Sequence, residues 1–460
     1  MLPSEEVENE PARRRLLVIA PDVVGARMAG PGLRFVAIAR ALAPHVDVTF
    51  ASGVSGSGVV DFDGAAVTTV AYSSRAELEV LIDGTDAVFC QFIDTNVARH
   101  AVESGIRIIY DLYNALPIET IGAERISGFD TAPEKDREFA ELLRYFRFCC
   151  ITGSLFVTSN ERQRDFWLGF MMASGALMPS TLDERDEKAI MPLLPFGMEN
   201  HEPSRTRSAL RGAHGITADD FVLIWAGGIW DWFDAETPIR AVAALAETNP
   251  NVKLVFYGTE HPNAVIGRPK AVDRARSLAE ELGVLGTQVI FLDAWVPAAE
   301  RADYLLDADA AVSAHRPSLE TRFAFRTRVL DHFWARLPSI VSDGDWFAEY
   351  IREEGLGLVV PCSDLDAMVA AINRMSSDAL LRSETIDRID AVRERWRWEA
   401  TTASLVHALT VGFEDLQPGR LPAADSGAEL PALPGPGRSA LRERVSSSRL
   451  GSAYRSMRGR

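Results

Sequence analysis

Cysteines and long apolar runs are scarce in this 460-residue chain. The four cysteines, Cys90, Cys149, Cys150 and Cys362, lack metal-ligand spacing, so we expect small buried hydrophobic residues rather than ligands or disulfide partners. No apolar run approaches the roughly 20 residues that a membrane span requires. The N-terminal stretch is acidic and then basic, without the apolar core of a secretory signal. These absences predict a reduced, cytoplasmic protein.

Positive charge is also in deficit, with 48 Lys and Arg against 65 Asp and Glu and a formal net charge of −17. This balance argues against a nucleic-acid partner. A dehydrogenase is disfavoured as well, because no tight G-x-G-x-x-G follows residues 16–20 and no acid ends the run 46–51. An acidic protein that binds an anion must gather its basic residues at that site, so local arginine clusters become candidates.

Alternating apolar runs and helical patterns predict an α/β protein with two doubly wound domains. Expected strands lie at 16–20, 46–51, 87–91, 106–110 and 155–158, and then at 221–225, 253–257, 289–291, 310–313, 339–342 and 358–360. Expected helices include 33–42 and 134–146. Such alternation is typical of parallel sheets with helices on both faces.

Composition divides the chain into five parts. We expect a disordered lead at 1–14, a first Rossmann-like domain at 15–195, a second at 196–395, a helix at 396–414 that packs back on the first, and a Pro/Gly-rich linker with a basic tail at 415–460. Residues 438–460 carry seven arginines and one glutamate. This tail is either simply solvated or a peripheral contact with anionic lipid at the inner face of the membrane, where each basic residue adds roughly 1 kcal/mol.

The stretch 221–246 is the most informative part of the sequence. A buried strand ends in Gly227-Gly228, a turn with Trp230 and Asp231 follows, and a helical pattern begins at Thr237. A similar strand, Gly-rich loop and helix stand at 15–43. Two such units in series imply a ligand cleft between two domains.

Four motifs, in order, resemble those of GT-B fold glycosyltransferases of the retaining family 4 type. They are Met28-Ala-Gly-Pro-Gly-Leu-Arg34, Pro195-Phe-Gly-Met198, Leu330-Asp-His-Phe-Trp-Ala-Arg-Leu-Pro-Ser-Ile-Val341 and the helix at Trp398. The resemblance covers roughly 15–412. It implies two Rossmann-like domains facing a cleft, a C-terminal crossover helix, and transfer of a sugar from a nucleotide-sugar donor to a saccharide or lipid-linked acceptor with retention. The turn at 230–234 resembles that of a subgroup tied to surface-polysaccharide assembly.

Two departures from the family pattern leave other functions open. Many members carry two glutamates separated by seven residues, where this chain has Phe323 and Asp331. Many also carry an Arg and a Lys in the turn at 229–233, where this chain has no cation. A non-catalytic GT-B scaffold that binds sugar or protein, and a sugar-nucleotide epimerase on the same fold, therefore stay open beside transfer.

The donor-side candidates lie in the second domain. A diphosphate leaving group needs cations or oriented N–H groups, and Arg322, Arg326 and Arg328 precede the helix that contains Asp331. We expect Arg326 and Arg328 to replace the missing Arg/Lys pair, Asp331 to accept from the ribose or sugar, and Glu320 to hold sugar hydroxyls. The predicted catalytic residues are Glu320, Arg326 and Asp331, and the predicted donor-binding residues are Gly227, Gly228, Trp230, Asp231, His315, Arg322 and Arg328.

The acceptor-side candidates are Gly30, Gly32 and Arg34 in the N-terminal loop and Asp111 at the carboxyl end of a predicted strand. The resemblance implies that the departing diphosphate itself takes the acceptor proton, so no protein nucleophile is required. We expect no metal and no cofactor, with the nucleotide-sugar acting as co-substrate, because the Asp-x-Asp triplets at 307–309 and 343–345 flank predicted strands and are typical of turns.

Overall fold

The computed structural model describes residues 13–26, 28–121, 129–182, 186–258, 269–292 and 296–422. Most of the predicted N-terminal lead and the whole predicted basic tail at 438–460 lie outside the described residues. Within this part, no helix combines the length and the apolar character that crossing a membrane demands.

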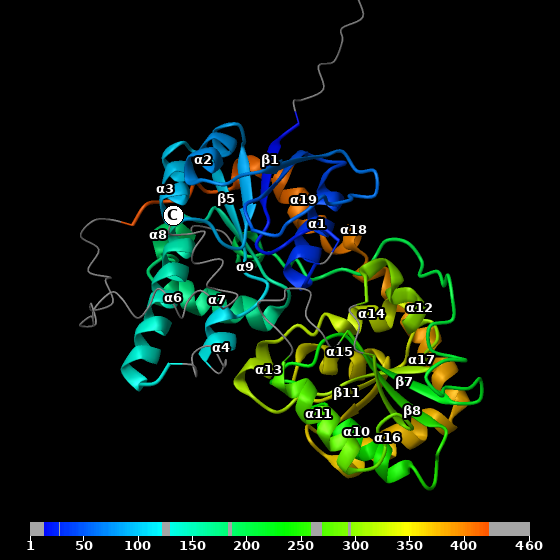
Figure 1. The fold of residues 1–460 in the computed structure, drawn as a ribbon. Coiled ribbons are helices and arrows are strands. Elements are labelled where there is room, and N and C mark those ends of the chain that lie inside the picture. Colours follow the sequence, from blue (N-terminus) through cyan, green and yellow to red (C-terminus); the bar gives the residue numbers. More distant parts are fainter. Residues whose placement is uncertain are drawn as a thin grey trace, which may run out of the picture.

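Two six-stranded parallel sheets form the framework of the protein (Figure 1). The first has the order β3-β2-β1-β4-β5-β6 and the second the order β12-β11-β10-β7-β8-β9. Counted from the first strand of each domain, both have the 3-2-1-4-5-6 order of a doubly wound fold, which is the fold class that the sequence predicts. Ligands bind such sheets outside the carboxyl ends of the strands.

The first domain surrounds the first sheet. Its strands are β1 (Arg15–Ile19), β2 (Asp47–Ser52), β3 (Val67–Ala71), β4 (Ala87–Cys90), β5 (Arg107–Asp111) and β6 (Leu155–Val157). Its helices are α1 (Gly30–Leu42), α2 (Arg75–Asp83), α3 (Thr95–Glu103), α4 (Leu116–Ile121), α6 (Ala132–Thr152), α7 (Glu161–Ala173), α8 (Pro179–Leu182) and α9 (Glu187–Ile190). Helix α6 is longer than the predicted 134–146 because a Thr131/Glu134 capping box starts it earlier and its C-terminal turns are apolar and buried.

The second domain surrounds the second sheet. Its strands are β7 (Phe221–Ala226), β8 (Val252–Tyr257), β9 (Val289–Leu292), β10 (Ala310–Ser313), β11 (Ser339–Ser342) and β12 (Gly357–Val360). Its helices are α10 (Glu236–Leu245), α11 (Lys270–Glu281), α12 (Arg301–Leu305), α13 (Leu319–Phe323), α14 (Arg328–Trp334), α15 (Trp346–Glu354), α16 (Leu365–Ser377) and α17 (Ala379–Val392).

Burial explains which strands could be recognised in the sequence. Strands β4 and β7 are buried along their whole length, as expected for parallel strands covered by helices on both faces. Strand β3 was not predicted, because it is an edge strand whose Thr68 and Thr69 are exposed and leave no apolar run. Cys90, Cys149 and Cys150 are buried and form no disulfide, as predicted, whereas Cys362 is only half-buried and its thiol donates to the Asp343 carbonyl at 3.0 Å.

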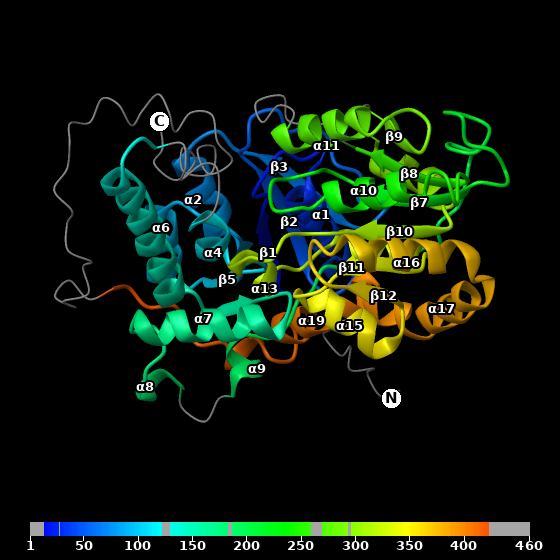
Figure 2. The same ribbon diagram turned by 90° about the horizontal axis from the view of Figure 1, so that it is seen from below.

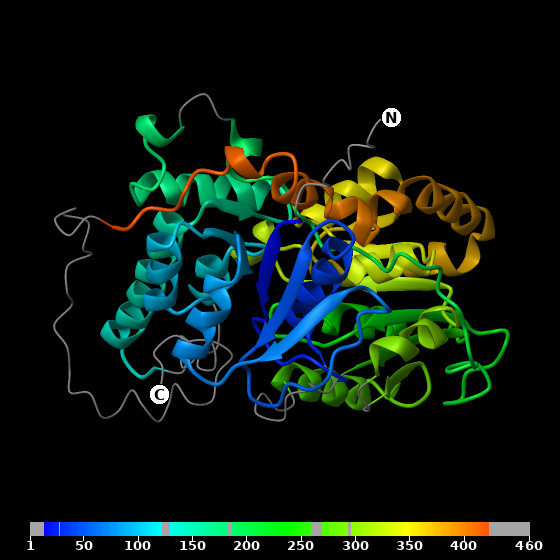
Figure 3. The ribbon, with the colours of Figure 1, turned by 90° about the horizontal axis from the view of Figure 1, so that it is seen from above.

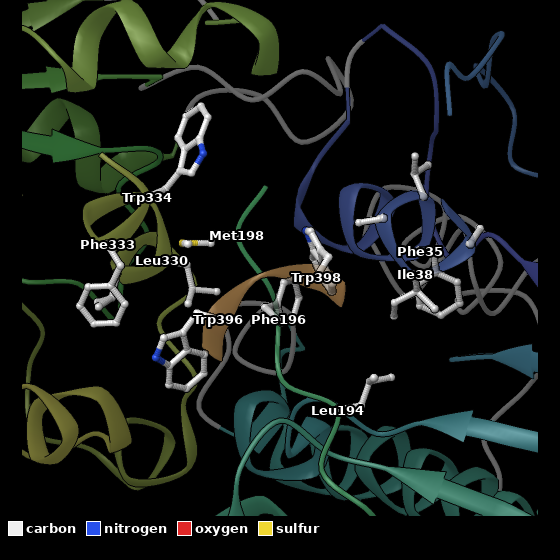
Figure 4. Close-up of a cluster of buried hydrophobic side chains, with 14 of the residues drawn as sticks. Phe35, Ile38, Leu194, Phe196, Met198, Leu330, Phe333, Trp334, Trp396 and Trp398 are labelled. Atoms are coloured by element: carbon white, nitrogen blue, oxygen red, sulfur yellow. The ribbon is translucent and has the colours of Figure 1, made fainter. Parts of the chain in front are cut away.

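A hinge of buried aromatic and aliphatic side chains joins the two domains (Figure 4). The linker backbone pairs with the crossover segment, since the Met198 N–H donates to the Trp396 carbonyl at 2.6 Å and the Trp398 N–H donates to the Met198 carbonyl at 3.1 Å. Gly197 allows this approach, because a Cβ there would lie 2.7 Å from the Trp398 Cα. The linker and the crossover segment therefore form one packed unit.

The crossover segment returns to the first domain as short pieces rather than as the single helix predicted for 396–414. They are a 3-10 turn (Arg393–Trp396), α18 (Trp398–Thr401), α19 (Ala403–Leu409) and a second 3-10 turn (Phe413–Asp415). The helix breaks at Thr402, whose hydroxyl donates to the Trp398 carbonyl at 2.6 Å, a contact that competes with regular helix. The orange segment in Figure 3 runs along the first domain, where the Arg107 Nε donates to the Leu416 carbonyl at 3.0 Å.

Candidate functional site

A cavity of about 590 Å³ lies between the two domains. Its walls come from the start of α1, the loop after β5, the linker at 196–199, the loop after β7, and the segment from α13 into α14. The volume is within the range typical of small-molecule sites. Because β5 and β7 deliver their loops from the carboxyl ends of parallel strands, the cavity occupies the position where ligands bind doubly wound sheets.

The loop after β7 brings backbone to the cavity wall. Gly227 has a φ of 97°, a left-handed value that favours glycine, and both Gly227 and Gly228 line the cavity. Trp230 lines it too, stacked on Trp232 with 5.6 Å between ring centroids. Asp231 is not among the lining residues and instead forms an ion pair with Arg274 at 2.7 Å.

The start of helix α10, which follows this loop, is already capped by the protein itself. The Asp234 carboxylate accepts from the Thr237 N–H at 3.0 Å and from the Thr237 hydroxyl at 2.7 Å. A helix N-terminus attracts anions, and here a side-chain carboxylate fills that position. Positive charge for an anionic ligand must therefore come from side chains elsewhere in the cavity.

Glu320 and Arg326 form a tight pair on the cavity wall. The two guanidinium Nη atoms of Arg326 donate to the two carboxylate oxygens of Glu320 at 2.9 and 2.7 Å. Arg326 is 6% exposed and also lies 3.7 Å from Asp345, whose pKa burial raises to about 6 against the opposing charge of Arg326. Both predicted residues reach the cavity, but the charge of Arg326 is already balanced by carboxylates.

Arg328 is the cation on this wall whose charge is not balanced. Its Nη2 donates to the Gly228 carbonyl at 2.7 Å, and its guanidinium lies 3.9 Å from the centroid of the Phe233 ring. Among the described residues no carboxylate lies within ion-pair distance of it, although the charge of Asp331 acts on it from farther away, and its Nη1 has no hydrogen-bond partner. Burial and the nearby charge of Arg326 lower the pKa of Arg328 to about 9, so it stays charged at neutral pH.

Asp331 belongs to an ionic chain that crosses the domain boundary. Its carboxylate lies 3.4 Å from the Arg301 Nε, Arg301 lies 3.3 Å from Glu199, and Glu199 pairs with Arg40 of α1 at 2.6 Å. Burial raises the pKa of Asp331, although the charge of Arg301 opposes that rise. Burial would lower the pKa of Arg301, but the carboxylates of Asp331 and Glu199 outweigh it and raise that pKa. All four side chains line the cavity.

Two more predicted donor-side residues, besides Asp231, do not reach the cavity. His315 is 1% exposed and lies behind the wall, with its Nε2 3.0 Å from the Asp343 carbonyl. Burial, assisted by the charge of Arg326, lowers the pKa of His315 to about 4, so the ring is neutral at pH 7. Arg322 is exposed and is absent from the lining, and its carbonyl accepts from the Arg162 side chain.

The first domain contributes a buried ion pair beneath its side of the cavity. Arg34 and Asp111 are both 0% exposed, and the carboxylate accepts from Arg34 Nε at 2.6 Å and from Nη2 at 2.9 Å. Arg34 lines the cavity, whereas Asp111 does not, because its carboxylate is used to hold Arg34. Gly30 also lines the cavity, while Gly32 is a packing position where a Cβ would lie 2.8 Å from the Val23 carbonyl oxygen.

Sequence patterns gave no sign of three side chains in the ionic chain, Arg40, Glu199 and Arg301. Each lies outside a recognisable motif, and the ion pairs join residues that are more than 250 positions apart in the sequence. Only Arg40 stands in an apolar stretch, whereas Glu199 and Arg301 have polar or charged neighbours and give no local signal. Within the described residues no group of three or more His, Cys, Asp or Glu side chains is arranged to hold a metal ion.

Comparisons with known proteins agree with this geometry. Residues 220–378, the second domain, match the family model described as glycosyl transferases group 1. No curated protein matches the chain in sequence.

Solved structures match over most of the chain. The crystal structure of Anabaena Alr3699/HepE with UDP and glucose has a TM-score of 0.61 at 12% identity and covers 86% of this chain and 100% of its own. WaaG, a glycosyltransferase involved in lipopolysaccharide biosynthesis, has a TM-score of 0.59 at 14% identity over 86% of this chain and 99% of its own. Sucrose-phosphate synthase from Thermosynechococcus elongatus has a TM-score of 0.57 at 16% identity over 88% of this chain and 100% of its own.

Proposed function

We propose that this protein, which has the GT-B fold and a group 1 glycosyltransferase domain at 220–378, transfers a sugar from a nucleoside diphosphate donor to an acceptor within the interdomain cavity. The observation that carries the proposal is Arg328. Arg328 is half-buried on the cavity wall, and a half-buried arginine without a carboxylate at ion-pair distance is costly unless an anion completes the site. Its position beside the Gly227-Gly228 turn suits a diphosphate.

The donor would span the second domain's side of the cavity. Its diphosphate would lie against Arg328 and the glycine turn, and Glu320 would accept hydrogen bonds from sugar hydroxyls. Asp331, held by Arg301, would accept from the ribose or the sugar. Anabaena HepE was crystallised with UDP and glucose in a related fold, so a UDP-sugar is the first donor to test.

Transfer with retention would need no nucleophile from this chain. As the glycosidic bond to the diphosphate breaks, the acceptor hydroxyl attacks the same face of the sugar. The departing diphosphate oxygen accepts the hydroxyl proton. The side chains contribute by positioning both substrates and by stabilising the negative charge that develops on the leaving group.

A saccharide or lipid-linked acceptor would enter against the first domain. Arg34, Tyr113 and Asn114 line that side, and the carboxylates of Asp61 and Glu119, which also line it, could accept from acceptor hydroxyls. Surface polysaccharide or glycoconjugate synthesis at the cytoplasmic face of a membrane is the setting that we favour. The basic segment at 438–460 would then provide the contact with anionic lipid.

The first experiment is a thermal-shift screen against UDP, GDP, ADP and dTDP and their common sugar conjugates. A stabilising shift with one nucleotide family would support the donor site and identify the base. Release of free sugar from the matching conjugate would then support transfer chemistry. Binding without cleavage would favour a non-catalytic scaffold, an isomerised sugar would favour an epimerase, and no shift with any nucleotide would contradict the proposal.

A further inference from the structure

The N-terminal turn of α7, in the first domain, reaches across to the second domain and binds its backbone. The Arg162 Nη1 donates to the Arg322 carbonyl at 3.0 Å and to the Gly344 carbonyl at 3.1 Å. The Gln163 Nε2 donates to the Phe323 carbonyl at 2.9 Å. Two adjacent side chains therefore hold three carbonyl groups of the opposite domain, and two of these belong to α13.

Gln163 is fixed in place for this contact by its own domain. It is 0% exposed, its Oε1 accepts from the Ser159 N–H at 3.0 Å, and its backbone N–H donates to the Asn160 side chain at 2.9 Å. The side-chain Nε2 of Gln163 is the atom that donates to the second domain, at the Phe323 carbonyl. The Oε1 and Nε2 of this buried side chain both form hydrogen bonds. Displacing the side chain would leave one of these atoms unpaired, which costs about 1–3 kcal/mol.

Helix α13 is a single short helix between the cavity and α7. Figure 2 shows α13 beside α7 and α4, and the Phe323 ring packs against Phe166 of α7 with 5.7 Å between centroids. The same helix carries Glu320 at the cavity wall, and Arg326, its ion-pair partner, follows three residues after Phe323. A helix of five residues has little rigidity of its own, so the position of Glu320 depends on the contacts of α13, which are the Thr321 hydroxyl bond to the Arg316 carbonyl at 2.8 Å on one side and α7 on the other.

We propose that Arg162 and Gln163 are positioning residues through which the first domain sets the donor side of the cavity. By holding the carbonyls of Arg322 and Phe323, they fix α13 so that the Glu320–Arg326 pair faces the donor sugar. The donor site is then complete only when the domains touch along α7. This inference rests on the proposed function of the cavity and adds to it a residue pair outside the cavity lining.

The same interface supplies a control. Glu161, the neighbour of Arg162, accepts from the Trp346 Nε1 at 2.9 Å and holds no carbonyl of α13. Glu161→Gln therefore changes a contact between the same two domains without touching the proposed positioning contacts. Gln163→Glu keeps the acceptor for the Ser159 N–H but replaces the donating amide by a carboxylate oxygen next to the Phe323 carbonyl.

The test compares these two variants with wild type in the full-length protein. Hydrogen–deuterium exchange of peptides covering 319–326 is measured without ligand, together with UDP affinity and UDP-glucose cleavage, or with the conjugate of whichever nucleotide binds in the screen. For Gln163→Glu we expect at least tenfold faster exchange in 319–326, at least a tenfold loss of kcat, and UDP affinity within twofold of wild type. Glu161→Gln should match wild type in all three. A merely structural defect would instead lower nucleotide affinity and Tm together.

Two results would overturn the inference. One is unchanged hydrogen–deuterium exchange in 319–326 in the Gln163→Glu variant, because the position of α13 would then not depend on its contacts with α7. The other is faster exchange with wild-type kcat, because the position of α13 would then not matter for turnover. If wild type neither binds a nucleotide nor cleaves a conjugate, the proposed function fails instead, while the exchange measurement still decides whether α7 holds α13.

Discussion

Replacing Arg328 should separate ligand binding from stability. In Arg328→Met the apolar side chain keeps most of the volume against the Phe233 ring and removes the charge. A charge-assisted contact is worth about 1.5–3 kcal/mol, and 1.4 kcal/mol is a factor of ten, so the affinity for a nucleoside diphosphate should fall about 10- to 150-fold. Isothermal titration with UDP, or with the nucleotide identified by thermal shift, measures this loss.

The stability of the ligand-free Arg328→Met variant should stay close to that of wild type. The substitution removes one hydrogen bond to the Gly228 carbonyl and two cation–ring contacts, with Phe233 and Trp225, together about 2–4 kcal/mol. It also removes a half-buried charge that has no carboxylate at ion-pair distance, and the partial desolvation of that charge costs a few kcal/mol. The two terms nearly cancel, so the free energy of unfolding should change by no more than about 1 kcal/mol.

Arg326→Met is the matched comparison, because it removes an arginine from the same wall. Here the carboxylates of Glu320 and Asp345 lose their counter-charge, and breaking a buried pair in this way costs about 3–5 kcal/mol. We therefore expect urea unfolding to show a large loss of stability for Arg326→Met and little for Arg328→Met. Unchanged nucleotide affinity in Arg328→Met, or a loss of stability as large as that of Arg326→Met, would refute the assignment of Arg328 as the free cation.

Three further predictions test the fold and its ionisable groups. Asp111→Asn leaves the buried Arg34 without its counter-charge, so urea unfolding should show a loss of about 3–5 kcal/mol, and an unchanged midpoint would contradict the buried pair. The pKa of His332 is lowered by burial to about 3, below the 6.5 of the unfolded chain, so stability is full above pH 6.5 and is lost as the pH falls. Between pH 7 and pH 5 His332 contributes about 2 kcal/mol to this loss, so His332→Gln should lose about 2 kcal/mol less than wild type in urea titrations at the two pH values. Gly197→Ala places a Cβ 2.7 Å from the Trp398 Cα and should lower the free energy of unfolding by about 1–3 kcal/mol, a change that thermal unfolding detects and that Gly30→Ala, with open space around it, should not show.

The fold was predictable because burial leaves a strong pattern. Strands such as β7 are continuous apolar runs, and their alternation with helices predicts parallel sheets of the doubly wound kind. Strand β3 and the break at Thr402 were not predictable in this way. An edge strand has no apolar run to detect, and a threonine hydroxyl that bonds to a helix carbonyl leaves no mark in a pattern of apolar positions.

The site was predictable as a region but not as a set of roles. The sequence places Glu320, Arg326 and Arg328 in one segment, yet only the structure shows that Glu320 pairs with Arg326 and leaves Arg328 free. Whether Glu320 pairs with Arg326 or with Arg328 depends on how the short helix α13 packs against its surroundings. Asp111, predicted to contact the acceptor, instead accepts a hydrogen bond from Arg34. The sequence could not show this, because a residue at the end of a strand can lie beneath a cavity as easily as on its wall.

The crossover segment has a consequence for the order of events during synthesis. Leu405, Leu409 and Phe413 belong to the same buried cluster as Leu16 and Phe35, so the first domain has its full core only after the ribosome has made the second. The same cluster also holds second-domain residues such as Val222 and Phe333, and each domain has a further cluster of its own, from Leu17 to Met191 in the first and from Phe221 to Met375 in the second. Domains generally fold as units while the chain emerges. The face of each sheet that packs on its own cluster can therefore be covered as that domain emerges, whereas the faces that share the larger cluster keep apolar surface uncovered until the crossover segment has been made.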